Sequence, residues 1–361
     1  MKSRVSAIGL IGTMAAMSSA QAAETRSFVV DWFYMTPAVS KTEVDCVGGL
    51  NPPADIQFAR MLRDLGKSEE DIEEALAGFP HTMYQVRNRG RINGKEVNVY
   101  TNPTSTHDPN IKRVSGPNAL GFNLDGEVSE NDFFDPETGE KGIDNQFFRA
   151  LGCINSERGD LGTRPTYPTI QWDTARPQMQ AWLIQVRGID DARNDDDVEV
   201  GVYQANMPIV RDLLADAQWD VTFQLNGNPR SKNEVKGRIE NGVVMTDAFD
   251  LNLIGHRYFL PELTMHKAKL RLKLNEDGSA TGVVGGYQKW PPLYANLAKG
   301  GSSYEVNLSF DVPGMYYALK KSADADPDPE TGQNLSISAA YRIEAVPAYI
   351  VDGNAQTARA E

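Results

Sequence analysis

Long apolar runs are the first thing that this sequence of 361 residues lacks. A helix that crosses a bilayer needs about 20 consecutive apolar residues. The longest apolar stretch, from Val5 to about Met17, is shorter than that, and no later window is more apolar. The sequence therefore predicts no transmembrane segment.

Cysteine and histidine are also scarce, with two and four residues. Neither Cys46 nor Cys153 stands in a C-x-x-C or C-x-x-C-H motif, so thiol redox catalysis and covalent haem have no support. The G-x-S-x-G, H-E-x-x-H and P-loop patterns are absent from the sequence as well. An enzyme is therefore not indicated, although 49 acidic residues provide chance pairs of carboxylates of the kind that glycoside hydrolysis uses.

Basic residues are in deficit, since 36 lysines and arginines face 49 aspartates and glutamates, for a net charge of -13. A surface of this sign repels phosphate backbones and attracts divalent cations or basic partners. Nucleic-acid binding is therefore excluded as a main function. The sequence does not identify the partner, which we expect to be a ligand or an envelope protein.

The first 23 residues have the three-part layout of a secretory signal peptide. Lys2 and Arg4 form a basic start, the apolar stretch follows, and Ala20-Gln21-Ala22 fits the small-x-small rule for cleavage after Ala22 or Ala23. Removing these residues takes away two bases and no acids, which changes the net charge from -13 to -15. We expect a soluble protein exported to the periplasm or the exterior.

An oxidising compartment makes a disulfide between Cys46 and Cys153 the default expectation, with two free buried thiols as the alternative. Such a bond would join the N-terminal region to the middle of the chain. In the chain-entropy model, closing so long a loop stabilises the fold by about 4–5 kcal/mol.

Alternating polar and apolar residues dominate the chain after residue 168 and predict a mainly β protein. Trp182, Ile184 and Val186 alternate with polar or outward positions, and turns at Asn241-Gly242 and near Gly278 link further strands. An additional strand is expected over 304–310, a helix over 315–322 and a last strand over 336–350. We expect an antiparallel β-sandwich or jelly roll over 111–361.

A mixed α/β region is expected over 24–110, before the sandwich. An apolar strand covers 27–34, and two short helices follow between Ile56 and Phe79, the second beginning at Ser68. Asn93-Gly94 predicts a tight hairpin turn between extended segments at 83–91 and 95–100.

Carboxylates crowd the stretch 123–146, in which Lys141 is the single base. Oxygen ligands on a glycine-punctuated loop suit Ca²⁺, which takes six to eight oxygens, although the spacing is not that of an EF-hand. The alternative is a solvated acidic loop, in which Asp135-Pro136-Glu137-Thr138-Gly139 is a simple turn, and the same five residue types recur at 328–332. Two further acid clusters, at 190–199 and 324–328, are expected to be solvated loops or weaker ion sites.

Several short motifs resemble those of a group of uncharacterised exported bacterial proteins. These are Gly142-Ile143-Asp144-Asn145-Gln146, the strand-like 182–188, the acidic 194–198, Gly285-Gly286-Tyr287 and the segment 337–341. The resemblance covers roughly residues 120–350 and implies no activity. It implies that the Asp-Asn pair is a loop element similar to calcium-type loops, which makes the predicted calcium ligands Asp125, Asp132, Asp135, Asp144 and Asn145.

Two functions are compatible with these features. The favoured one is a non-catalytic, calcium-stabilised β module that binds a surface ligand or partner. The alternative is a secreted, glycosidase-like hydrolase with an Asp/Glu pair in a cleft, which requires two carboxyl groups within about 5–10 Å of each other.

Overall fold

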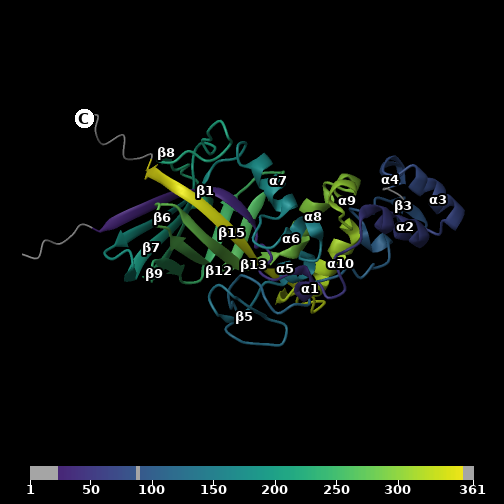
Figure 1. Ribbon diagram of the computed structural model, residues 1–361, viewed down its shortest axis with the longest axis horizontal. Helices are drawn as coiled ribbons and strands as arrows, with labels where there is room; N and C mark the ends of the chain where they lie inside the picture. The colour runs from purple at the N-terminus through teal and green to yellow at the C-terminus, as the bar shows by residue number, and fades with distance from the viewer. Residues whose placement is uncertain (1–22, 87–89, 353–361) are drawn as a thin grey trace, which may run out of the picture.

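The computed structural model describes residues 23–86 and 90–352, so the predicted signal peptide lies almost entirely outside them. Figure 1 shows most strands gathered at one end of the molecule and most helices at the other. Eight strands form one continuous antiparallel sheet, in the order β1 (Glu24–Met35), β6 (Trp182–Ile189), β7 (Asn194–Gln204), β9 (Asn233–Glu240), β10 (Val243–Thr246), β12 (Glu262–Leu274), β13 (Ala280–Lys289) and β15 (Asn334–Val351).

The sheet closes on itself, because β1 pairs with β6 on one side and with β15 on the other. The mainly β prediction is confirmed, but the sandwich or jelly roll gives way to an eight-stranded barrel. Alternation of apolar residues is the same in both architectures, whereas closure depends on pairing between the first and last strands, as in Phe28 with Pro347. Register shifts in β1, β7 and β12 mark bulges, which bend strands and aid closure.

Both faces of the closed sheet carry buried side chains. Ile184, Val186 and Leu272 belong to the main interior core, as their alternation predicted. Leu183 faces outward but is also buried, because β8 (Val221–Gln224), parallel to β15, covers it together with neighbouring loops. Smaller elements extend the sheet at its margins: β11 (Phe249–Ile254) pairs with β12, and β14 (Ala325–Pro327) pairs with β15.

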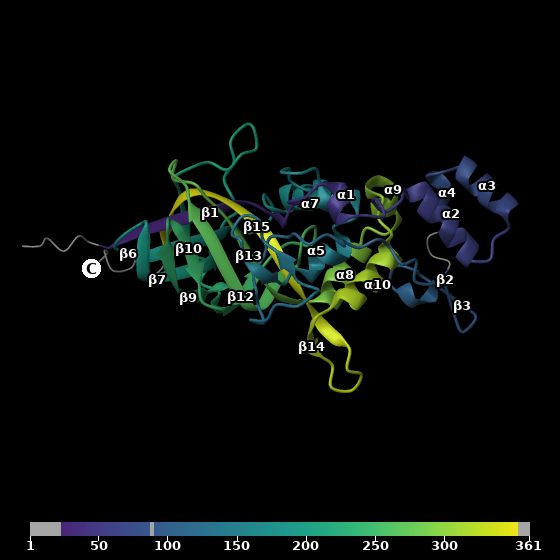
Figure 2. The same ribbon diagram turned by 60° about the horizontal axis from the view of Figure 1, so that its bottom comes forward.

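Helices cover one end of the closed sheet (Figures 1 and 2). They are α1 (Thr42–Asp45), α5 (Gln146–Leu151), α6 (Asn155–Arg158), α7 (Thr166–Ala175), α8 (Trp290–Ala298), α9 (Ser302–Leu308) and α10 (Val312–Ser322). Helix α10 confirms the helix expected at 315–322. The strand expected at 304–310 is wrong, because α9 occupies most of it: Tyr304 and Leu308, four residues apart, face the main core, while Val306 packs on a different cluster.

The outermost helices come from the N-terminal region. They are α2 (Ala54–Asp64), α3 (Glu69–Ala77) and α4 (His81–Val86). The predicted helix start at Ser68 is confirmed by a capping box with Asp71. A short hairpin of β2 (Gly90–Ile92) and β3 (Lys95–Val97) turns at Asn93 and Gly94, both with positive φ, as the sequence indicated. The segment from Met83 is helical in α4 rather than extended.

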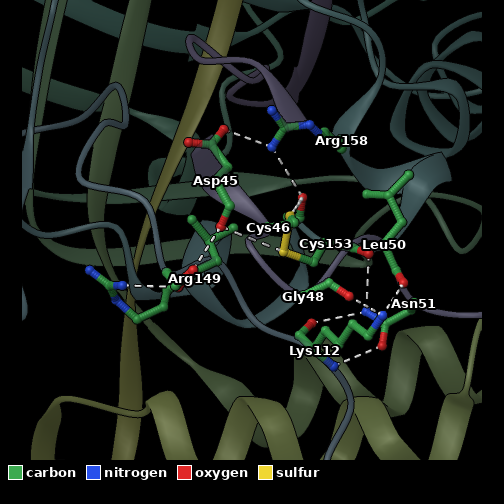
Figure 3. Close-up of a disulfide and its surroundings, with 12 residues drawn as sticks. Asp45, Cys46, Gly48, Leu50, Asn51, Lys112, Arg149, Cys153 and Arg158 are labelled. Carbon is green, nitrogen blue, oxygen red and sulfur yellow. Dashed lines mark hydrogen bonds and ion pairs between the residues drawn. A yellow bond between two sulfur atoms is a disulfide. The ribbon is translucent and has the colours of Figure 1, made fainter. Parts of the chain in front are cut away.

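The region 24–110 contributes β1 to the closed sheet, so it is joined to the following region by strand pairing as well as by the chain. A disulfide between Cys46 and Cys153 adds a covalent link, with the two Cα atoms 5.8 Å apart, which confirms the predicted bond. Beside it, Figure 3 shows the buried ion pair of Arg158 Nη1 with Asp45 Oδ2, at 2.7 Å. Within 23–86 and 90–352, no helix is long and apolar enough to span a bilayer.

Candidate functional site

The acidic loop lies on the outer face of β13 and β15. Leu124 of the loop and Leu120 and Phe122, which directly precede it, form a small buried cluster with side chains of both strands. Phe122 packs on the backbone of Gly285, where an added Cβ would come within 2.9 Å of the ring. This contact holds the start of the acidic loop against the sheet.

Asp135 is fully buried and makes structural contacts. Its Oδ2 forms an ion pair with Arg271 Nη2 of β12 at 2.5 Å, and its Oδ1 accepts a hydrogen bond from the backbone N–H of Glu137 at 2.8 Å. A second arginine, Arg342 of β15, pairs with Glu137 at 3.0 Å. Bases from neighbouring strands thus neutralise part of the loop, which contains only one base in its own sequence.

The turn at 135–139 recurs at 328–332 with the same geometry. In each, the glycine N–H donates to the aspartate carbonyl at 2.8 Å, and the glycine has positive φ. The aspartate Oδ1 accepts from the second residue after it in both turns, Glu137 and Glu330. The interpretation of this motif as a turn is confirmed.

Asn145 is buried and caps a helix. Its Oδ1 accepts the backbone N–H of Phe148 at the start of α5, while its Nδ2 donates to Thr36 Oγ1 and to the Leu120 carbonyl, both at 2.9 Å. All of these contacts are internal to the fold. Of the five predicted ligands, Asp135 and Asn145 are therefore engaged in holding the loop.

Asp144 is only 6% exposed and lies at the floor of a cleft. Its Oδ2 accepts the backbone N–H groups of Leu124 and Asp125, at 2.7 and 3.4 Å. Burial raises the pKa of this carboxyl to about 6, and the nearby charges of Asp125 and Asp132 add to the rise. Asp144 can therefore exchange a proton close to neutral pH.

Asp125 and Asp132 line the same cleft, so the structure brings together three of the five predicted residues. A fourth carboxylate, Asp324, comes from the segment after α10, and burial raises its pKa too. The sequence assigned Asp324 to a separate acid cluster, and only the pairing of β14 with β15 places it here. Desolvation and the charges of these four aspartates raise the pKa of Tyr287, which lies among them.

This cleft, which we call the acidic cleft, has a volume of about 810 Å³. It also contains hydrogen-bond donors, because Arg113, Arg149 and Lys321 belong to its lining. Arg149 is held over the ring of Phe133, 4.0 Å from its centroid, and its Nε is buried without a hydrogen-bond partner among the described residues. The acidic cleft therefore combines carboxylates with basic side chains that also bond within the protein: Arg149 donates to the Val114 and Asn131 carbonyls, and Lys321 pairs with Asp108.

Calcium ligation needs several oxygens that converge on one point. Both carboxylate oxygens of Asp132 accept hydrogen bonds from Ser129, and those of Asp324 accept from Ser338. In the part of the chain that the structure describes, no group of three or more His, Cys, Asp or Glu side chains is arranged to hold a metal ion. Calcium binding stays a prediction.

The other acid clusters lie apart or make local contacts. The 190–199 cluster follows Ile189, which pairs with Glu24 at the start of β1, whereas Asn145, next to Asp144 of the acidic cleft, donates to Thr36, just past the other end of β1. There, Asp195 accepts backbone N–H groups of its own loop. In the third cluster, Asp326 contacts Lys289 at 3.0 Å.

Comparisons with family models, with curated proteins and with solved structures found no match, so the resemblance to exported bacterial proteins stays a prediction.

Proposed function

We propose that this protein is an exported, non-catalytic binding module of the cell envelope or exterior, and that a hydroxyl-rich ligand such as a carbohydrate binds in the acidic cleft. The observation that carries this proposal is the meeting of four carboxylates with three basic side chains in one open cleft of about 810 Å³. A sugar hydroxyl both donates and accepts hydrogen bonds, so it needs such a mixed lining. Hydrogen bonds to charged groups contribute more to binding affinity than hydrogen bonds between neutral groups.

Export is supported by the layout of the first 23 residues and is compatible with the disulfide, since such bonds persist in oxidising compartments. The net charge of -13 is compatible with a cation in or near the cleft. Calcium is therefore proposed as an accessory to ligand binding.

A glycan array probed with the purified mature protein, in calcium and again in a chelator, tests the proposal. We expect bound glycans for the wild type and a loss of about ten- to hundredfold in affinity for Asp144→Asn, the range for removing a charged hydrogen-bond partner. The amide oxygen of the new side chain can still accept the Leu124 N–H, which limits damage to the loop. Asp190→Asn, at an exposed position of the distant acid cluster, is the matched control and should bind as the wild type does.

A hydrolase is the second candidate, and the raised pKa of Asp144 favours it. A carboxyl with a pKa of about 6 next to other carboxylates has the acid–base pairing that glycosidases use. Incubating the bound glycans with the protein and analysing the products separates the two functions. Release of shorter sugars by the wild type, but not by Asp144→Asn, would replace the binding proposal with a catalytic one.

A further inference from the structure

A small cavity lies between the end of the closed sheet and the helices that cover it. Met35 of β1 and Tyr341 of β15 form its sheet side, while α5, α6, α7 and α8 supply the helical side. Its volume is about 40 Å³, which is enough for roughly three water molecules. It shares no lining residue with the acidic cleft.

Four aromatic rings line this cavity: Phe147, Tyr167, Phe259 and Tyr341. The rings of Phe147 and Tyr341 are 6.1 Å apart and tilted relative to each other. Most of the remaining lining is aliphatic. Aromatic faces carry partial negative charge and attract organic cations, most strongly where water is excluded.

One carboxyl group stands in this apolar lining. Glu157 of α6 is only 2% exposed, and its carboxyl has no hydrogen-bond or ion-pair partner among the described residues. Burial raises its pKa to about 8. No basic side chain lines the cavity, and the neighbouring Arg158 turns away to Asp45.

The groups that face Glu157 otherwise titrate far from neutral pH. They are the hydroxyls of Tyr167 on α7 and Tyr341 on β15, whose pKa values burial also raises. Gln171 donates to Tyr167, and Tyr341 donates to Gln288 at 2.9 Å, so both hydroxyls are engaged in the protein. The lining from α5, α8, β1 and residues 259–260 carries no ionisable group.

We propose that this cavity is a binding site for a small organic ammonium ion, whose charge pairs with the Glu157 carboxylate and lies against the four rings. A buried carboxylate is stable only with a counter-charge or sufficient hydrogen bonds, and the described protein supplies neither. An ammonium ion with short alkyl groups supplies the charge, and its alkyl groups match the apolar lining. A ligand of only a few heavy atoms matches the volume.

A surface hollow of about 340 Å³ adjoins the cavity. It shares Leu260, Leu293 and Asn296 with the cavity, so displacement of these side chains would connect the two. The negative net charge raises the local concentration of cations around the protein.

Calorimetric titration of the full chain with tetramethylammonium at about pH 6, 7 and 8.5 tests the site. The probe does not titrate, so affinity should follow ionisation of Glu157, rising about tenfold from pH 6 to 7 and levelling above about pH 8. Glu157→Gln should lose at least tenfold in affinity at high pH, as well as the pH dependence. tert-Butanol, a neutral molecule of similar shape, should bind more weakly.

Two variants serve as controls and one provides a second test. Glu74→Gln on the exposed face of α3 and Asp144→Asn in the acidic cleft should bind the probe as the wild type does. Phe259→Leu removes one ring and should weaken binding while keeping the pH dependence. Absence of binding to the wild type at high pH, equal affinity in Glu157→Gln, or loss of binding in Asp144→Asn would each overturn the proposal.

Discussion

Replacing Glu157 with glutamine should change how stability depends on pH. The buried carboxyl has a pKa of about 8, against an ordinary value of 4.5, because burial disfavours its charged form. The folded state therefore binds this proton more tightly than the unfolded state. The stability that this protonated carboxyl contributes to the folded state is fully present below about pH 4.5 and is lost as the pH rises to about 8.

The magnitude follows from the difference between these two pKa values. At about 1.4 kcal/mol per pH unit, the wild type loses about 3 kcal/mol between pH 4.5 and 7, and about 4 kcal/mol between pH 4.5 and 8.5. Glutamine has nearly the same shape and no charge, so Glu157→Gln should remove this loss. The variant should therefore gain stability relative to the wild type as the pH rises.

Urea unfolding of both proteins across pH 4.5–8.5 measures the effect. Subtracting one curve from the other cancels shared groups such as Glu305, whose burial raises its pKa to about 7. Glu74→Gln, at an exposed position, should give a difference close to zero throughout. The difference in free energy of unfolding between the wild type and Glu157→Gln should therefore change with pH. A constant difference would refute the reasoning, because it would mean that Glu157 has the same pKa in the folded and unfolded states.

Three further predictions concern the fold. Asp135→Asn should lower the free energy of unfolding by about 2 kcal/mol, because it removes the charge of a buried carboxylate that pairs with half-buried Arg271 and leaves Arg271 only Glu140, at 3.6 Å. Asp328→Asn in the matching exposed turn should cost less than about 1 kcal/mol, and similar losses in urea unfolding would contradict this. Replacing Cys46 and Cys153 with serine should lower stability by about 4–5 kcal/mol, and an unchanged urea midpoint would contradict the loop-closure argument. Gly285→Ala should lower the free energy of unfolding by about 1–3 kcal/mol and increase hydrogen exchange at 119–125, because the added Cβ would press on Phe122. Gly48→Ala, where an added Cβ meets only ordinary contacts, is the control, and equal effects of the two variants would count against the contact.

Local features were predictable from the sequence. Ser68 and Asp71 make a capping box, Asn93-Gly94 makes a hairpin turn, and the two Asp-Pro-Glu-Thr-Gly segments make the same turn. In each case the determining contacts lie within a few residues, where side-chain chemistry acts on its own backbone. Strand alternation was predictable for the same reason.

Features that depend on distant contacts were not predictable. The barrel requires β1 to pair with β15, about 310 residues later, and nothing in the local pattern specifies this. The acidic loop by itself indicates a cation because it has one base, yet Arg271 and Arg342 reach it from other strands. Glu157 had no sequence signal, since its character comes from the apolar groups that surround it in the fold.

Chemical-shift mapping with the glycan that binds best on the array tests the central claim most directly. If the acidic cleft is the ligand site, the largest shifts in labelled protein will fall at residues around Asp125, Asp144, Tyr287 and Asp324, and Asp144→Asn will reduce them. Shifts concentrated on another face of the closed sheet, or unchanged by Asp144→Asn, would contradict the account.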